Sequence, residues 1–175
     1  MENNYLKILD KLHEEFPEAT LVYKQHSKFM RLLGDLLFFN KSFLYDYTTT
    51  IGNHIYLPIG WDTWPEDSRT IILRHEMVHL RHQKRYGLFL YGFLYLFLFF
   101  PIGLSYFRMR FEKEAYEESI RAHFDIYGKA LALSFMPYEK KDYIRFFTGP
   151  DYGWMWPFKK NIENWFDSTV RKYSK

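Results

Sequence analysis

Residues 87–107, GLFLYGFLYLFLFFPIGLSYF, form a run of 21 residues without a charged side chain. A run of this length can cross a bilayer as one helix, so it constrains the fold strongly. Pro101 and Gly103 can divide it into two shorter arms. Three interpretations follow: burial in the fold or an oligomer interface, contact with one membrane leaflet, or a true span. Basic residues on both flanks favour two ends on the same face of a membrane: Arg81, Lys84, Arg85, Arg108, Arg110 and Lys113.

Length and composition limit the classes of site that the chain can build. Its 175 residues fit one domain that is large enough to bury a core. The absence of cysteine excludes disulfides, thiolate metal sites and cysteine nucleophiles, so only His, Asp and Glu can bind a metal. A formal net charge of +3 is too small to indicate nucleic-acid binding. The charged, amphipathic start does not resemble a secretory signal, so we expect a cytoplasmic protein.

The hydrophobic pattern predicts an α+β fold. Between the first three predicted helices, residues 20–25 are expected to form a strand and residues 43–61 a hairpin that turns at Gly52 and Asn53, with HIYLP as its second strand. We therefore predict one domain over 1–175, with 87–107 as an apolar insert and 138–175 as an aromatic C-terminal segment. Apolar residues recur at helical spacing in five segments, the second of which opens with a possible Ser27 cap: 3–16, 27–39, 65–86, 107–136 and 157–173.

The third predicted helix carries HEMVH at residues 75–79. At about 100° per residue, His79 lies about 40° around the helix from His75 and about 6 Å along it, so both rings can reach one ion. Glu76 lies beside such an ion, where its carboxylate can take a proton from a metal-bound water. The spacing predicts a Zn²⁺ site with His75 and His79 as ligands and Glu76 as general base.

The alternative is a buried helix that happens to contain two histidines. Leu73, Met77 and Leu80 line the side opposite the histidines, so polar groups here would be costly to bury without a partner, which favours a metal. His82 shares the face of His75 but lies about 10 Å along the axis, too far for one ion. We interpret His82 as a neighbour of the site or a surface residue.

The predicted helix at 107–136 offers candidates for a third ligand. Lysine and arginine intermix with most of its acids, as on a solvated face. Glu112 differs, because Tyr116, Ser119 and His123 follow it at helical spacing and form a polar stripe that can face the histidines. The acids in question are Glu112, Glu114, Glu117 and Glu118.

RHEMVH followed by RFEKEA resembles the gluzincin class of zinc metallopeptidases. In that class two histidines of HExxH and a downstream glutamate, followed three residues later by Ala or Ser, hold zinc. The chain is especially similar to the RFExxAD stretch of membrane-bound CAAX-type peptidases. The resemblance covers residues 71–116 and implies a minimal zincin-like fold, with the HExxH helix at its centre. It makes His75, His79 and Glu112 the ligands, with Glu114 as the alternative third ligand.

Two further expectations concern catalysis and substrate binding. The class often has aspartate where this chain has Tyr116, so the role of this residue is not fixed, and Tyr116 or His123 is expected to assist as an oxyanion donor. In zincins an edge strand pairs with the substrate, so residues 54–58 are expected to bind an extended peptide by strand addition, with an ordinary hairpin as the alternative. A membrane span at 87–107 would place Glu112 across the bilayer from both histidines, so the span and this ligand set exclude each other.

Three functional hypotheses follow. The first is a zinc-dependent endopeptidase acting on a peptide or protein substrate. The second is a zincin fold used as a structural or interaction protein, similar to small HExxH proteins encoded by tailed phages, with a place in the phage particle. The third is a membrane-associated peptidase that contacts the bilayer, or an oligomer partner, through residues 87–107.

Overall fold

The computed structural model describes residues 4–36, 43–96, 105–150 and 154–175. The chain divides into two compact units, Met1–Arg81 and His82–Lys175. The division falls inside helix α3 (Glu66–Tyr86), so the last residues of this helix count with the second unit. A single domain over 1–175 stays a prediction.

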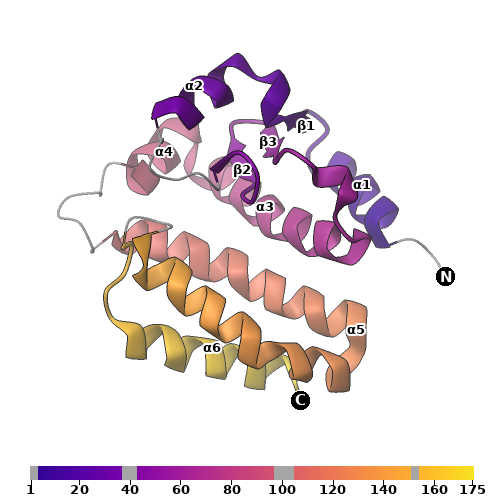
Figure 1. Cartoon of the computed structure of the whole chain (residues 1–175), viewed down its shortest axis with the longest axis vertical. Helices are drawn as coiled ribbons and strands as arrows, with labels where there is room; N and C mark the ends of the chain where they lie inside the picture. The colour runs from indigo at the N-terminus through magenta and orange to yellow at the C-terminus, as the bar shows by residue number, and fades with distance from the viewer. Residues whose placement is uncertain (1–3, 37–42, 97–104, 151–153) are drawn as a thin grey trace. The chain divides into compact units, whose positions relative to one another are not determined.

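The first unit combines helices with a small mixed sheet, which confirms the predicted α+β class (Figure 1). The strand order is β1-β3-β2, with β3 parallel to β1 and antiparallel to β2. The elements in chain order are α1 (Asn4–Glu15), β1 (Thr20–Tyr23), η1 (Lys24–His26), α2 (Lys28–Leu36), β2 (Thr49–Ile51), β3 (His54–Leu57), η3 (Trp61–Thr63) and α3. The zincin-like identity of this arrangement stays a prediction.

The predicted hairpin is confirmed, but the role expected of its second strand is wrong. Ile51 pairs with His54 across the turn, and Gly52 adopts the left-handed φ of 58° that this turn requires. β3 is the central strand, so its backbone hydrogen-bonding groups already pair with β1 and β2. Residues 54–58 therefore cannot take up a substrate by strand addition. β2, which lies at the edge of the described sheet, has the position that this role needs.

Local signals in the sequence mark the start of α2 and the end of α3. The Ser27 hydroxyl accepts a hydrogen bond from the Met30 backbone N–H at 3.2 Å, which caps α2 as predicted. α3 ends at Tyr86, before Gly87 with its φ of 77°, also as predicted. The expected end of the second helix, at 37–39, lies outside the described residues.

One hydrophobic core holds the first unit together. It joins the inner faces of α1 and α3 to β3 and to Trp61, which is fully buried. α3 therefore has a defined rotation about its axis, because Leu73, Met77 and Leu80 must face this core. The core residues are Ile8, Leu12, Ala19, Ile55, Leu57, Trp61, Leu73, Met77 and Leu80.

The second unit is helical in its described residues and comprises α4 (Leu88–Leu96), α5 (Tyr106–Thr148) and α6 (Lys159–Tyr173). α5 is longer than the predicted helix at 107–136 and is interrupted at Gly128, where φ is 72° and ψ is 166°. Glycine adopts this conformation without the steric cost that a side chain would add. The chain reverses there, and the two arms of α5 lie side by side (Figure 1).

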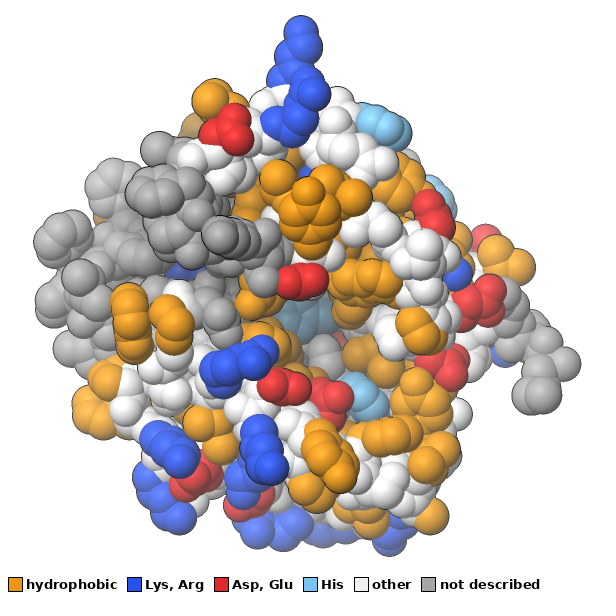
Figure 2. Space-filling model, in the orientation of Figure 1, with side chains coloured by type: hydrophobic (Ala, Val, Ile, Leu, Met, Phe, Trp, Pro, Cys, Tyr) orange, Lys and Arg blue, Asp and Glu red, His pale blue; other side chains and the backbone are white. Residues whose placement is uncertain are grey.

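Aromatic packing joins the two arms of α5 to α6. The Tyr116 ring lies 4.5 Å from the Tyr143 ring, and Tyr143 in turn contacts Phe166 of α6. Lys172 and Glu117 form an ion pair of 2.6 Å between α6 and α5. In the lower part of Figure 2, basic and acidic side chains lie close together among hydrophobic ones, as expected for a solvated face with mixed charges.

The uncharged run forms a short helix over its first half. α4 has nine residues, and residues 97–104 lie outside the described part of the chain. Within the described residues, no helix combines the length and the apolar character needed to cross a bilayer.

The α1 contact with the core is testable with a matched pair of leucines. Leu12 is fully buried, whereas Leu6 on the same helix is 57% exposed. We expect L12A to lower the free energy of unfolding by about 2–5 kcal/mol, because it leaves a cavity, and L6A to change it by less than about 0.5 kcal/mol. Urea denaturation followed by circular dichroism measures both. Equal effects would contradict the assigned orientation of α1.

Candidate metal centre

The two histidines of α3 lie close enough to share one ion. Their Nε2 atoms are 3.2 Å apart, and their rings meet edge to face with centres 5.0 Å apart. Acidic residues in the first turn of α3, Glu66 and Asp67, suit the positive end of the helix dipole and fix where the helix begins. Both histidines are buried. The predicted neighbourhood of His75 and His79 is confirmed.

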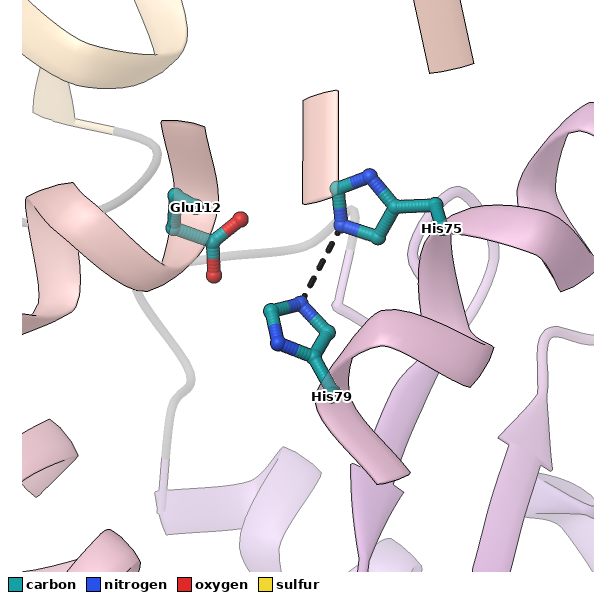
Figure 3. A group of neighbouring side chains, drawn as sticks. All are labelled: His75, His79 and Glu112. Carbon is teal, nitrogen blue, oxygen red and sulfur yellow. Dashed lines mark hydrogen bonds between the residues drawn. The ribbon is translucent and has the colours of Figure 1, made fainter. Parts of the chain in front are cut away.

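Glu112 of α5 completes a group of three potential ligands. His75, His79 and Glu112 each offer one ligand atom, and these atoms all lie within 4.8 Å of one another. Figure 3 shows the two imidazole rings and the carboxylate directed toward a common point. Glu112 is 1% exposed. The group can hold a metal ion.

The donor set and its spacing fit zinc. Two histidines and one carboxylate are a common ligand set of catalytic zinc, which leaves the fourth position to water or substrate. Zinc–nitrogen distances of about 2.0–2.1 Å at a tetrahedral angle place two ligand nitrogens about 3.3 Å apart. The observed 3.2 Å between the two Nε2 atoms agrees with this value.

Glu76 lies next in sequence to the first histidine and is held by a threonine. Its Oε2 accepts a hydrogen bond of 2.5 Å from the Thr50 hydroxyl on β2. Glu76 is 4% exposed and is not one of the three grouped ligands. A buried carboxylate that follows a ligand histidine and is not itself a ligand is the kind of group that can serve as a general base.

Tyr95 of α4 holds the carboxylate of the third ligand. Its phenol donates a short hydrogen bond to Oε1 of Glu112. The Arg108 guanidinium lies 5.0 Å from the centre of the Tyr95 ring, in a cation–π contact. Residues that hold a ligating carboxylate fix its orientation, so Tyr95 is a candidate for that role at this centre.

A buried lysine lies near the candidate base. Lys24 has no exposed surface, and its Nζ donates hydrogen bonds to the carbonyl oxygens of Phe43 at 2.7 Å and Tyr47 at 2.6 Å. Burial lowers the pKa of Lys24 to about 7, and the negative charge of Glu76 acts in the opposite direction. Lys24 therefore changes its charge near neutral pH.

The structure separates the two candidate glutamates. Glu114 accepts a hydrogen bond of 2.8 Å from Nε2 of His82 and is about half exposed, whereas the ligand group contains Glu112. His82 is 4% exposed and lies 4.7 Å from the Phe111 ring. His82 thus packs within the second unit and is absent from the ligand group, as its position along α3 predicts.

Tyr116 and His123, the expected oxyanion donors, make contacts within the second unit. Tyr116 packs among Tyr143, Phe146 and Phe147. Burial opposes protonation of His123, but the Glu139 carboxylate and the Ser119 carbonyl outweigh it and raise the pKa of His123. These contacts give both residues packing roles, and their catalytic roles stay predictions.

Three residues at or near this centre were not predicted from sequence: Lys24, Thr50 and Tyr95. Tyr91 and Tyr95 lie one helical turn apart in an otherwise apolar run. Because buried tyrosine hydroxyls usually have a hydrogen-bond partner, this spacing could have identified Tyr95. Lys24 and Thr50 carry no comparable signal, because their partners are distant in sequence.

Comparison of the chain with protein-family models, with curated proteins and with solved structures gives no match. The assignment of the centre therefore rests on its residues and their geometry.

The lowered pKa of Lys24 makes stability depend on pH. Between pH 7 and 10.5 an unfolded Lys24 keeps a proton that the folded one has lost, so the free energy of unfolding should rise with pH by up to about 1.4 kcal/mol per pH unit. K24M should lack this rise when urea denaturation is measured from pH 6 to 9. K28M, which removes an exposed lysine, is the control and should follow the wild type. Parallel curves for wild type and K24M would contradict a near-neutral pKa.

Proposed function

We propose that the chain is a zinc-dependent metallopeptidase of the gluzincin type. The proposal rests on the buried group of His75, His79 and Glu112, and on the buried carboxylate of Glu76, the residue that follows His75 on the same helix. A cluster with no catalytic task would not need a second buried carboxylate next to the ligands. Two imidazoles and one carboxylate also leave a net positive charge on a divalent ion, as Lewis-acid catalysis requires.

In the proposed hydrolysis, the residues around the metal site have different roles. A zinc ion bound here supplies Lewis-acid chemistry, lowering the pKa of a water and polarising the substrate carbonyl. Glu76 takes the proton of the attacking water and returns it to the leaving amine. Thr50 holds one oxygen of Glu76, which restricts the rotation of the carboxylate. Tyr95 holds the Glu112 carboxylate in its ligating orientation.

The position of β2 supports an extended peptide as substrate. β2 is an outer strand of the described sheet, and Thr50 in its centre contacts Glu76. A peptide that pairs with this strand would present its carbonyl groups next to the base. The strand that pairs with the substrate peptide in this proposal is therefore Thr49–Ile51 and not residues 54–58.

Replacement of the base separates catalysis from metal binding. We expect E76Q to keep about one zinc per chain, because Glu76 is not a ligand, and to lower the rate of peptide cleavage by at least about 100-fold, because the amide cannot accept the proton. Mass spectrometry measures zinc, and a fluorogenic peptide library measures cleavage.

E66Q is the matched control, since Glu66 lies in the first turn of the same helix and is 56% exposed. It should retain both zinc and activity. An E76Q protein that cleaves like the wild type would refute the proposed mechanism and favour a structural or interaction role.

A second proposal concerns where the enzyme works. We propose that α4 docks on an anionic membrane surface. Four apolar side chains of α4 are about half or more exposed, and the exposed basic residues Lys84 and Arg85 directly precede the helix. Apolar side chains can enter the interface while lysine and arginine contact anionic headgroups. The exposed side chains are Leu88, Phe89, Leu90 and Phe93.

Flotation with vesicles of phosphatidylglycerol and phosphatidylcholine tests this docking. The wild type should float with the vesicles, and the double variant F89S/F93S should not, because each buried phenylalanine contributes about 1.5–3 kcal/mol. The control L131S/L133S removes exposed leucines of α5 and should float. A double variant that floats like the wild type would rule out α4 as the docking surface.

A further inference from the structure

Lys24 is the first residue of η1 and is fully buried, although lysine is almost never fully buried without a partner. Its Nζ contacts three groups of one turn: the carbonyl oxygens of Phe43 and Tyr47 and, at 4.0 Å from the ring centre, the face of Phe43. The hydrolytic mechanism proposed above does not use Lys24. Its position therefore needs another explanation.

The two carbonyls that Lys24 binds lie at either end of the turn 43–47, which leads directly into β2. The Leu44 carbonyl of the same turn accepts a hydrogen bond of 2.9 Å from the Ile59 N–H, just after β3. The turn is thus held from two sides. Because β2 begins two residues after Tyr47, the position of the turn sets the position of the strand.

β2 carries the contact that reaches the candidate base. Thr50 pairs with Ile55 of β3 in the backbone register, and its hydroxyl donates to Oε2 of Glu76 at 2.5 Å. The last torsion of a glutamate side chain has a broad, shallow preference. The Thr50 hydroxyl is therefore positioned to fix the plane of the Glu76 carboxylate.

We infer that Lys24 is a positioning residue for the general base, acting by holding the turn 43–47 so that Thr50 binds the Glu76 carboxylate. This inference rests on the proposed function for the role of Glu76 as base, whereas the link from Lys24 through Thr50 to Glu76 stands on the structure. All residues of the link belong to the first unit.

The chemistry of an amine suits this task. A neutral amine keeps two N–H donors and an ammonium has three, so both carbonyls can stay bound in either charge state. When charged, Lys24 also attracts the Glu76 carboxylate. This attraction raises the pKa of Lys24 and so opposes the larger effect of burial. A methionine of similar length would fill the space without donating to either carbonyl.

A double-mutant cycle between Lys24 and Thr50 tests the inference. K24M and T50V should each lower kcat by about 10- to 100-fold with little change in KM, and the double variant should be no worse than T50V, because both remove the same contact. T50S, the conservative variant that keeps the hydroxyl, should restore most of the activity that T50V loses. K28M, at an exposed lysine, is the control.

An infrared measurement makes the test independent of peptidase activity. The carboxylate stretch of Glu76, isolated as the difference between each protein and its E76Q counterpart, should shift in T50V, shift equally in K24M, and stay unchanged in T50S and K28M. If the wild type cleaves no peptide, the proposed function is refuted. The carboxylate band still tests whether Lys24 acts on Glu76 through Thr50.

Two results would overturn the inference. The first is a Glu76 band in K24M identical to that of the wild type. The second is additivity of K24M and T50V, which would mean that Lys24 does not act through Thr50. Circular dichroism checks that each variant is folded, and K24L, which also lacks a donor, replaces K24M in the same cycle if K24M does not fold.

Discussion

Two buried imidazole nitrogens 3.2 Å apart on one helix are the constraint around which the candidate centre is built. At this separation the rings must share either a proton or a cation, since two lone pairs would otherwise face each other away from water. The buried carboxylate of Glu112 in the same group favours the cation. A shared proton joins the two nitrogens but leaves the carboxylate without a counter-charge. A divalent ion binds both nitrogens and also neutralises the carboxylate.

The surrounding elements serve this helix in different ways. The apolar face of α3 packs in the core of the first unit, which fixes the direction in which the histidines point. β2 supplies Thr50 to the neighbouring glutamate, and the turn that Lys24 holds determines where β2 begins. On the side of the third ligand, Tyr95 of α4 binds the carboxylate. Hydrogen bonds thus connect Glu76 and Glu112 to groups that can set the orientation of their carboxylates.

The predictable part of this protein was the part encoded by local spacing. Because an α-helix has 3.6 residues per turn, the spacing in HEMVH predicts that His75 and His79 are neighbours on one face. The Gly52–Asn53 pair likewise predicts the turn of the hairpin. Longer-range relations were less accessible. The inner position of β3 depends on its parallel pairing with β1, in which Thr20 pairs with His54, 34 residues later, so the sequence did not show that residues 54–58 lack a free edge. The reversal of α5 at Gly128 was also missed, because a single glycine in a helical pattern is usually tolerated.

One metal ion held jointly by His75, His79 and Glu112 is the feature on which the proposed chemistry depends. X-ray absorption at the zinc edge of the metal-loaded protein tests it most directly. We expect two imidazole ligands and one or two oxygen ligands at about 2.0–2.2 Å, with one oxygen lost or replaced by water and a weaker affinity in E112A. A zinc ion coordinated without imidazole, or a wild-type spectrum and affinity in E112A, would contradict it.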